Sequence, residues 1–371
     1  MNRRQLLTRA MGALALRAMP ELLSSNAFAA TSERDRQMTK TTQRVIACNG
    51  IHINIAEQGE GPLVLLVHGF PESWYSWRRQ IDDLAAAGFR VVAPDMRGYG
   101  KSDAPQAVDQ YTILHLVGDL VGILDALAAP QAVIVGHDWG ASIAWQAALT
   151  RPDRFRAVAA LSVPFRPRGK TLPTSVMPRT ENAQFYQLYF QEPGKAEAEL
   201  ERDSRATIRN MLFGASGDGV AAARAAAAAG GAAPNLGMVP KGGGFLQGPG
   251  APATLPPWIT EADIDFYAEQ FKRSGFRGAL NYYRNIDRNW EITGALSGLQ
   301  VTVPALYIAG DRDFIVGVPG TDQLLANMKG FVPGLRGISL LPGCGHWTQQ
   351  ERPNDVSAAL IEFVRALPSR T

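Results

Sequence analysis

The chain has few cysteines for its length, only Cys48 and Cys344 among 371 residues. Two cysteines are too few for a fold held together by disulfides, and their wide separation does not match the close spacing of a metal-binding cluster. We therefore expect two separate buried thiols rather than one disulfide, because a free cysteine behaves as a small apolar side chain. This excludes disulfide-rich scaffolds and cysteine-based metal domains.

Long hydrophobic runs and strong charge bias are also missing. No stretch of about 18 uncharged apolar residues occurs, so no membrane-spanning helix is expected. The formal net charge is +3 and no basic patch is interleaved with aromatic residues, so nucleic-acid binding is not expected. The composition, 46% hydrophobic and 19% charged, is typical of a globular protein. A length of 371 residues is enough for one large α/β domain with an insertion.

The N-terminal segment has the pattern of an export signal. Arg3 and Arg4 come before a short apolar stretch at 10–16, and Ala27-Phe28-Ala29 has the small residues of a cleavage site. Paired arginines are typical of twin-arginine export, which would place the mature protein in the periplasm. We therefore expect residues 1–29 to be a signal peptide outside the fold, with a cytoplasmic N-terminal tail as the alternative.

Strand and helix patterns alternate between Val45 and Ser162, which predicts a parallel sheet with helices on both of its faces. Continuous apolar runs indicate buried strands, and amphipathic segments that end near Gly or Pro indicate helices. The expected strands are Ile51–Ala56, Leu63–Val67, Arg90–Ala93, Ala132–Gly136 and Ala157–Ser162, and the expected helices are Arg78–Ala87 and Leu114–Ala128.

The alternation stops after Pro164, and residues 165–297 are helical in pattern and rich in aromatics. Later segments restore the first pattern, with strands at Val303–Ala309 and Gly337–Leu341 and a closing helix at Val356–Ala366. We therefore predict one α/β domain over 30–164 and 298–371, interrupted by a helical cap over 165–297. Within the cap, the Gly-, Ala- and Pro-rich stretch 214–257 is expected to be a mobile loop, with a short helix at Ala222–Ala229 as the alternative.

The segment Gly136-His137-Asp138-Trp139-Gly140 lies between an expected strand and the helical pattern Ala141–Leu149. This is the context of the G-x-S-x-G nucleophile elbow, but the central serine is missing and Asp138 takes its place. A carboxylate attacks saturated carbon and forms an alkyl ester of the enzyme, whereas a serine forms an acyl-enzyme. Asp138 therefore points to epoxides or alkyl halides as substrates and argues against a serine-type esterase.

A carboxylate nucleophile needs a base to hydrolyse its ester, and histidine is the usual base. Of the five histidines, only His346 lies in a glycine-rich loop after a late strand. In the chain order of this type of site, the acid precedes the histidine and follows the nucleophile. The strand Val303–Ala309 leads directly to Asp311 and Asp313, so either can be that acid.

His68-Gly69-Phe70-Pro71 follows the expected strand Leu63–Val67, and backbone amides at such a turn can face a developing oxyanion. The natural pair of donors is the amide of Phe70 and the amide of Trp139, the residue after the nucleophile. Gly98–Ser102 ends like a phosphate-binding P-loop, but Asp95 stands where that motif needs glycine, so we do not expect phosphate binding there.

Several longer stretches together resemble the epoxide hydrolases of the α/β-hydrolase fold, from about Ile51 to the C-terminus. They are HGFPESWYSWR (68–78), PDMRGYGKSD (94–103), GHDWGA (136–141), FYQLYFQEPG (185–194), FRGALNYYRN (276–285), GDRDF (310–314) and GCGHWTQQERP (343–353). The resemblance implies that the chain converts a small-molecule epoxide to a diol without a metal or organic cofactor. It does not indicate the oligomeric state.

The resemblance also implies roles that spacing alone does not give. Tyr186 and Tyr283 would be the two cap tyrosines that hold the epoxide oxygen, and a phenol suits this role because it can protonate the alkoxide that forms on ring opening. Asp313 rather than Asp311 would be the acid of the triad. Three aromatic side chains would line the substrate pocket: Phe70, Trp74 and Trp139.

Two other functions use a similar scaffold. A dehalogenase attacks with the same aspartate, but a halide leaves without a proton, so paired phenols would be unnecessary, and Phe70 stands where such enzymes usually have Asn or Trp. A non-catalytic ligand receptor would be expected to lack one catalytic group, whereas Asp138, Asp313, His346 and both tyrosines are present here.

Overall fold

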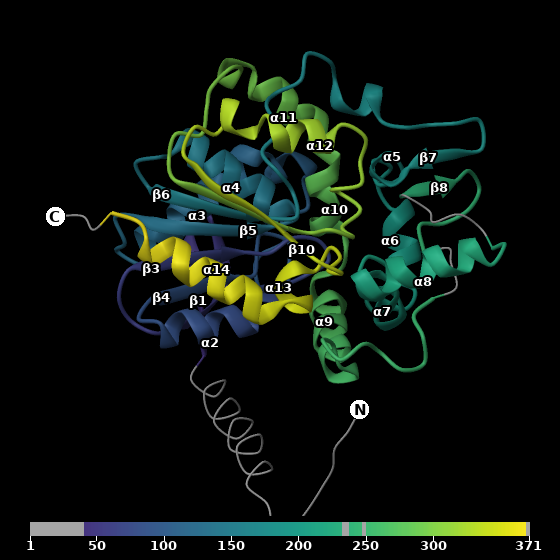
Figure 1. Ribbon diagram of the computed structural model, residues 1–371, viewed down its shortest axis with the longest axis horizontal. Helices are drawn as coiled ribbons and strands as arrows, with labels where there is room; N and C mark the ends of the chain where they lie inside the picture. The colour runs from purple at the N-terminus through teal and green to yellow at the C-terminus, as the bar shows by residue number, and fades with distance from the viewer. Residues whose placement is uncertain (1–40, 232–236, 247–249, 369–371) are drawn as a thin grey trace, which may run out of the picture. The chain divides into compact units, whose positions relative to one another are not determined.

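The computed structural model describes residues 41–231, 237–246 and 250–368 (Figure 1). The expected export signal at 1–29 lies outside these residues. Among the helices of this part of the chain, none is long and apolar enough to cross a membrane. Cys48 and Cys344 are both buried and free, which confirms the expectation of two separate thiols.

The central element is an eight-stranded sheet with the order β1-β2-β4-β3-β5-β6-β9-β10. Strands β1 and β2 are antiparallel to each other, β2 is also antiparallel to β4, and the remaining neighbours are parallel. The predicted, mostly parallel sheet is therefore confirmed. The strands are β1 (Thr42–Cys48), β2 (Ile51–Gln58), β3 (Leu63–Val67), β4 (Arg90–Pro94), β5 (Ala132–His137), β6 (Phe155–Leu161), β9 (Ala305–Gly310) and β10 (Leu335–Leu341).

Two apolar cores cover the two faces of this sheet, because side chains alternate along each strand. On β3, Val64 and Leu66 belong to one core, and Leu65 and Val67 belong to the other. The first core includes apolar residues of α2 and α14, and the second includes those of α3 and α4. These helices are α2 (Arg78–Ala86), α3 (Ile113–Ala126), α4 (Trp139–Thr150) and α14 (Pro353–Arg365).

The chain between β6 and β9 is mainly helical, and it is called the cap below. Helices α5 to α8 group together with two short strands (Figure 1). The cap helices are α5 (Tyr186–Tyr189), α6 (Lys195–Leu200), α7 (Ser204–Gly214), α8 (Gly217–Ala228), α9 (Glu261–Ser274), α10 (Arg277–Arg284) and α11 (Ile286–Ile292). The short antiparallel strands β7 (Ala183–Phe185) and β8 (Met238–Pro240) were not expected, because three residues are too few to show a period.

Helix α8 lies inside the stretch 214–257, where a mobile loop was predicted, so that prediction is wrong for Gly217–Ala228. Ser216 explains the difference: its hydroxyl accepts the N–H of Gly219 at 3.0 Å and caps the helix. The alanines that follow have high helix propensity. The alternative of a short helix over the alanine run is therefore the one found.

The parallel strands bring their carboxyl ends to one edge of the sheet. Gly136 at the end of β5 pairs with Val67 of β3 on one side and with Ala160 of β6 on the other. On the next strands, Ile308 pairs with β6 and Gly310 pairs with Leu341 of β10. The loops that follow β3, β5, β9 and β10 are therefore neighbours, and these loops carry the expected site residues.

Candidate active site

Asp138 lies at the sharp turn between β5 and α4, with φ 54° and ψ −119°. This is a backbone conformation that non-glycine residues rarely adopt, so the turn holds the carboxylate in a strained but fixed place. The glycines on either side are required by close approach: a Cβ on Gly136 would overlap the carbonyl of Gly140, and a Cβ on Gly140 would overlap the carbonyl of Val67. The local sequence thus builds the predicted elbow.

The carboxylate of Asp138 is buried and held by its surroundings. The backbone N–H of Phe70 donates to Oδ1 of Asp138 at 2.8 Å. A Cβ on Gly69 would overlap the same carboxylate, so glycine is needed for this approach. Burial alone would raise the pKa of Asp138, but His346 outweighs burial and holds the pKa below its usual value. Asp138 is therefore an anion, as a nucleophile must be.

The amide of Trp139, the second expected oxyanion donor, opens α4 directly after the nucleophile. It has no hydrogen-bond partner within the described part of the chain. An N–H at this place is free to donate to negative charge that develops on the Asp138 carbonyl.

The loop after β10 brings His346 to the nucleophile. Nε2 of His346 lies 3.6 Å from Oδ2 of Asp138, and Nδ1 lies 3.1 Å from Oδ1 of Asp313. Nδ1 also lies 3.0 Å from the hydroxyl of Ser162 at the end of β6. Asp311 is not part of this group, since its carboxylate accepts the N–H of Gly343 at 2.8 Å. The geometry therefore selects Asp313, which the spacing alone left open.

The pKa of His346 is set by its two carboxylate neighbours. Burial by itself would lower this pKa, but Asp313 and Asp138 outweigh burial and raise it to about 10. The imidazole is therefore protonated in the resting site and forms an ion pair with each carboxylate. It can act as a base only after one of these charges is lost.

Tyr186 at the start of α5 and Tyr283 in α10 lie together in the cap, with ring centroids 5.9 Å apart. The Tyr283 ring is 5.6 Å from Phe70 and 5.2 Å from Trp139, which connects the pair to the nucleophile loop and the elbow. Burial, followed by the Asp138 carboxylate, raises the pKa of Tyr186, and burial and Tyr186 raise that of Tyr283. Both phenols are therefore neutral hydrogen-bond donors.

Aromatic rings surround these groups, and not all are the expected ones. Phe70 and Trp139 contact the cap tyrosines. Trp74 instead packs against Tyr75 and Phe266, at 5.6 and 5.9 Å, and belongs to the core that contains Val64 and Leu66. The structure therefore does not bring Trp74 to the other site residues. Two rings that the sequence reasoning missed contact Tyr186: Phe190 at 5.5 Å and Phe245 at 5.8 Å. The spacing of four residues from Tyr186 to Phe190 was the available signal.

A buried network behind the nucleophile was also missed. Oε2 of Glu72 lies 2.8 Å from Nδ1 of His137, and Nε2 of His137 lies 2.7 Å from the backbone carbonyl of His346. Glu72 also accepts the N–H of Gly69 at 3.3 Å. These contacts connect the Phe70 loop, the elbow and the base loop. Glu72, His137 and His346 are far apart in the sequence, so no local sequence pattern predicts that they are in contact.

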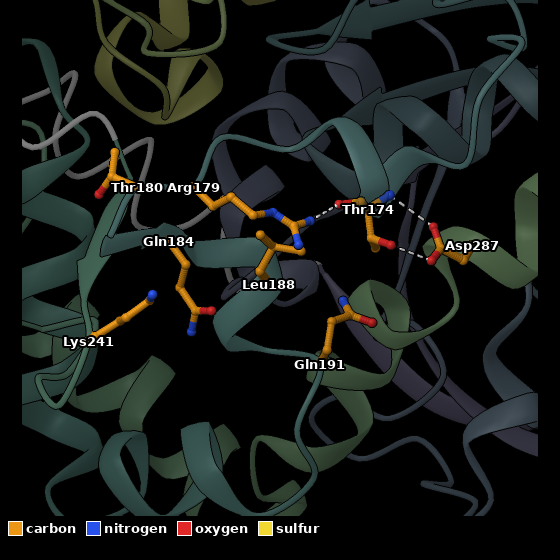
Figure 2. Close-up of a pocket in the computed structure, with 8 residues that line it drawn as sticks. All are labelled: Thr174, Arg179, Thr180, Gln184, Leu188, Gln191, Lys241 and Asp287. Carbon is orange, nitrogen blue, oxygen red and sulfur yellow. Dashed lines mark hydrogen bonds between the residues drawn. The ribbon is translucent and has the colours of Figure 1, made fainter. Parts of the chain in front are cut away.

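A separate hollow of about 510 Å³ lies in the cap (Figure 2). It contains none of the expected site residues, and its only carboxylate, that of Asp287, already accepts two hydrogen bonds from Thr174. One of its residues touches the site indirectly, since the side chain of Gln191 donates to the backbone carbonyl of Tyr283 at 2.9 Å. Its lining is Thr174, Arg179, Thr180, Gln184, Leu188, Gln191, Lys241 and Asp287.

Comparisons with known proteins agree with this geometry. Residues 62–353 match the model of the alpha/beta hydrolase fold family. Epoxide hydrolase A of Mycobacterium tuberculosis is 46% identical over 90% of this chain and 100% of its own, and epoxide hydrolase 3 of Siraitia grosvenorii is 43% identical over 86% and 96%. The solved structure of an epoxide hydrolase from an endophytic Streptomyces has a TM-score of 0.82 and 44% identity over 88% of this chain and 96% of that one. The chain therefore belongs to the α/β-hydrolase fold family and, within it, to the epoxide hydrolases.

Proposed function

We propose that this epoxide hydrolase opens an apolar epoxide through a covalent ester on Asp138 and releases a vicinal diol. The observation that carries the proposal is the position of the Asp138 carboxylate, which is anionic, accepts the Phe70 amide at 2.8 Å and lies 3.6 Å from His346. The aromatic surroundings of Tyr186 and Tyr283 favour an apolar substrate with one polar atom, the epoxide oxygen.

In the first step, a carboxylate oxygen of Asp138 attacks the less hindered ring carbon, and the carbon–oxygen bond of the ring breaks. Tyr186 and Tyr283 hold the epoxide oxygen, and one phenol gives its proton to the alkoxide. The charge of Asp138 is lost in the ester, so protonated His346 becomes more acidic. It gives its proton to the phenolate and becomes neutral. The products of this step are a hydroxyalkyl ester, two neutral phenols and a neutral imidazole.

In the second step, His346 takes a proton from water, and the hydroxide adds to the ester carbonyl of Asp138. The amides of Phe70 and Trp139 stabilise the tetrahedral oxyanion, a contribution on the order of 3 kcal/mol per donor. Collapse of this intermediate releases the diol, whose new hydroxyl takes the second proton of the water. Asp138 is again a carboxylate and His346 is again protonated, so the cycle is balanced.

A single turnover in ¹⁸O-labelled water tests the covalent route. With enzyme in excess over a terminal aryl epoxide, we expect label in the peptide that contains Asp138 and none in the diol of that first turnover, read by mass spectrometry. Chloride release from a matched alkyl chloride provides the control for dehalogenation. Label in the first diol with Asp138 unlabelled would refute the ester.

We also propose that residues 1–29 are a twin-arginine export signal and that the mature enzyme is periplasmic. The support is the Arg3-Arg4 pair and the Ala27-Phe28-Ala29 pattern before Ala30. Expression of the full chain in a bacterium with a functional twin-arginine pathway should give periplasmic protein that starts at Ala30, and the double change Arg3→Lys and Arg4→Lys should retain it in the cytoplasm. An uncleaved cytoplasmic chain in both cases would contradict the proposal.

A further inference from the structure

The loop that carries His346 is attached to the cap as well as to the sheet. The backbone N–H of His346 donates to the carbonyl of Ala215 at 2.9 Å, and the indole N–H of Trp347 donates to the carbonyl of Leu212 at 2.6 Å. Leu212 is in α7, and Ala215 follows the end of that helix. The position of the base therefore depends on the segment between α7 and α8.

Glu351, at the end of α13 (Thr348–Glu351), joins the two sides of this contact. Its Oε2 accepts the N–H of Gly217 from the cap at 2.8 Å and the N–H of Gly345 from the base loop at 2.9 Å. Its Oε1 accepts the N–H of Trp347 at 3.0 Å. One carboxylate thus holds three backbone amides, two next to His346 and one at the start of α8.

This carboxylate is buried, with 9% of the residue exposed, and it has no salt bridge to a basic side chain within the described residues. A buried charge is costly unless hydrogen bonds satisfy it, so the three amides are what keep it there. Burial raises the pKa of Glu351, and hydrogen bonds from the same amides oppose that rise.

The backbones at this contact approach too closely for side chains. A Cβ on Gly217 would overlap the carbonyl of Gly343, and a Cβ on Gly345 would overlap the N of Gly217. The two backbones are therefore in direct contact with no flexible side chain between them, so a displacement of the cap segment would also displace the base loop.

We propose that Glu351 is a positioning residue that ties the cap segment Ala215–Gly217 to His346 and so sets the imidazole for hydrolysis of the Asp138 ester. The proposal rests on the covalent route described above. The bond changes that form the ester involve Asp138 and the two tyrosines, none of which contacts Glu351, and His346 gives its proton to the phenolate only once the ester has formed. Hydrolysis needs His346 in reach of both a water and the ester carbonyl, so this half-reaction depends on Glu351.

The test separates the two half-reactions in the full-length enzyme by rapid quench and mass spectrometry of the alkyl-enzyme. For Glu351→Gln, whose amide hydrogens face backbone N–H donors, we expect hydrolysis to slow roughly 10- to 100-fold, the cost of a small misplacement of a catalytic group, and ester formation to change less than about threefold. The ester should accumulate. Glu362→Gln, an exposed glutamate of α14, is the matched control and should hydrolyse the ester at the native rate.

Two further variants keep the test decisive. Gly217→Ala perturbs the same contact from the cap side and should also slow hydrolysis selectively, and Glu351→Asp, which keeps the charge, should recover part of the rate. Equal slowing of both half-reactions in Glu351→Gln and Gly217→Ala, or native hydrolysis in both, would overturn the positioning role. If the native enzyme forms no ester at all, the covalent route itself fails, which is a different result.

Discussion

The change of charge on Asp138 should control when His346 can act as a base. In the resting site, the imidazole has a pKa of about 10 because burial is outweighed by Asp313 and Asp138. Nε2 of His346 lies 3.6 Å from Oδ2 of Asp138. At an effective dielectric constant of about 20, loss of a unit charge at this distance is worth about 4 to 5 kcal/mol, or about 3 pH units. The pKa of His346 should therefore fall to roughly 7 in the ester.

This shift predicts different pH profiles for the two half-reactions. Ester hydrolysis needs neutral His346, so its rate should be low below neutral pH, rise through a midpoint near the lowered pKa and then level off. Ester formation needs ionised Asp138 and neutral phenols, so its rate should stay level across the neutral range. Rapid-quench measurement of both steps across pH checks this prediction.

A direct measurement of the same shift uses Asp138→Asn, which removes the charge and keeps the shape. NMR titration of the His346 ring should give a pKa about 3 units lower in this variant than in the native enzyme. An imidazole that titrates at the same high pH in both proteins would refute the reasoning. Hydrolysis with no pH dependence through the neutral range would do the same.

Three further predictions concern the cap and the core. The double change of Tyr186→Phe and Tyr283→Phe should slow ester formation roughly 100-fold or more per phenol, measured by rapid quench, and an unchanged rate would remove the phenols from the mechanism. Gln187→Leu removes the amide that donates to the Tyr186 oxygen at 3.1 Å, so ester formation should slow about tenfold while hydrolysis of the ester stays native. Asp119→Asn removes the charge that pairs with buried Arg97, so the free energy of unfolding, measured in urea, should fall by about 3 to 5 kcal/mol. Asp153→Asn changes an exposed ion pair and should lower it by less than about 1 kcal/mol. Equal effects of the two changes would contradict the argument from burial.

The fold was predictable wherever a local pattern fixes the structure. Leu63–Val67 was predicted and found as a strand with the same bounds, because a buried parallel strand must be apolar on both faces. The elbow around Asp138 was predictable because the backbones at Gly136 and Gly140 leave no room for a side chain. The loop prediction for α8 was wrong because it rested on the high content of glycine and alanine. The start of this helix depends on one hydrogen bond, from the N–H of Gly219 to the hydroxyl of Ser216, which the composition does not show.

The sequence by itself determined the kind of chemistry, which is attack by a carboxylate on saturated carbon. The residue type at the elbow and the order of Asp138, an acid and His346 along the chain can both be read without a structure. Spacing left Asp311 and Asp313 open and the resemblance favoured Asp313, which the structure places against His346. Only the tertiary structure decided that Trp74 packs in the core that contains Val64 and Leu66, and that Glu72 and Glu351 hold the catalytic loops together. The physical reason is that local patterns specify backbone conformation over a few residues. Buried hydrogen bonds between distant segments exist only once the sheet has brought the ends of its strands to one edge.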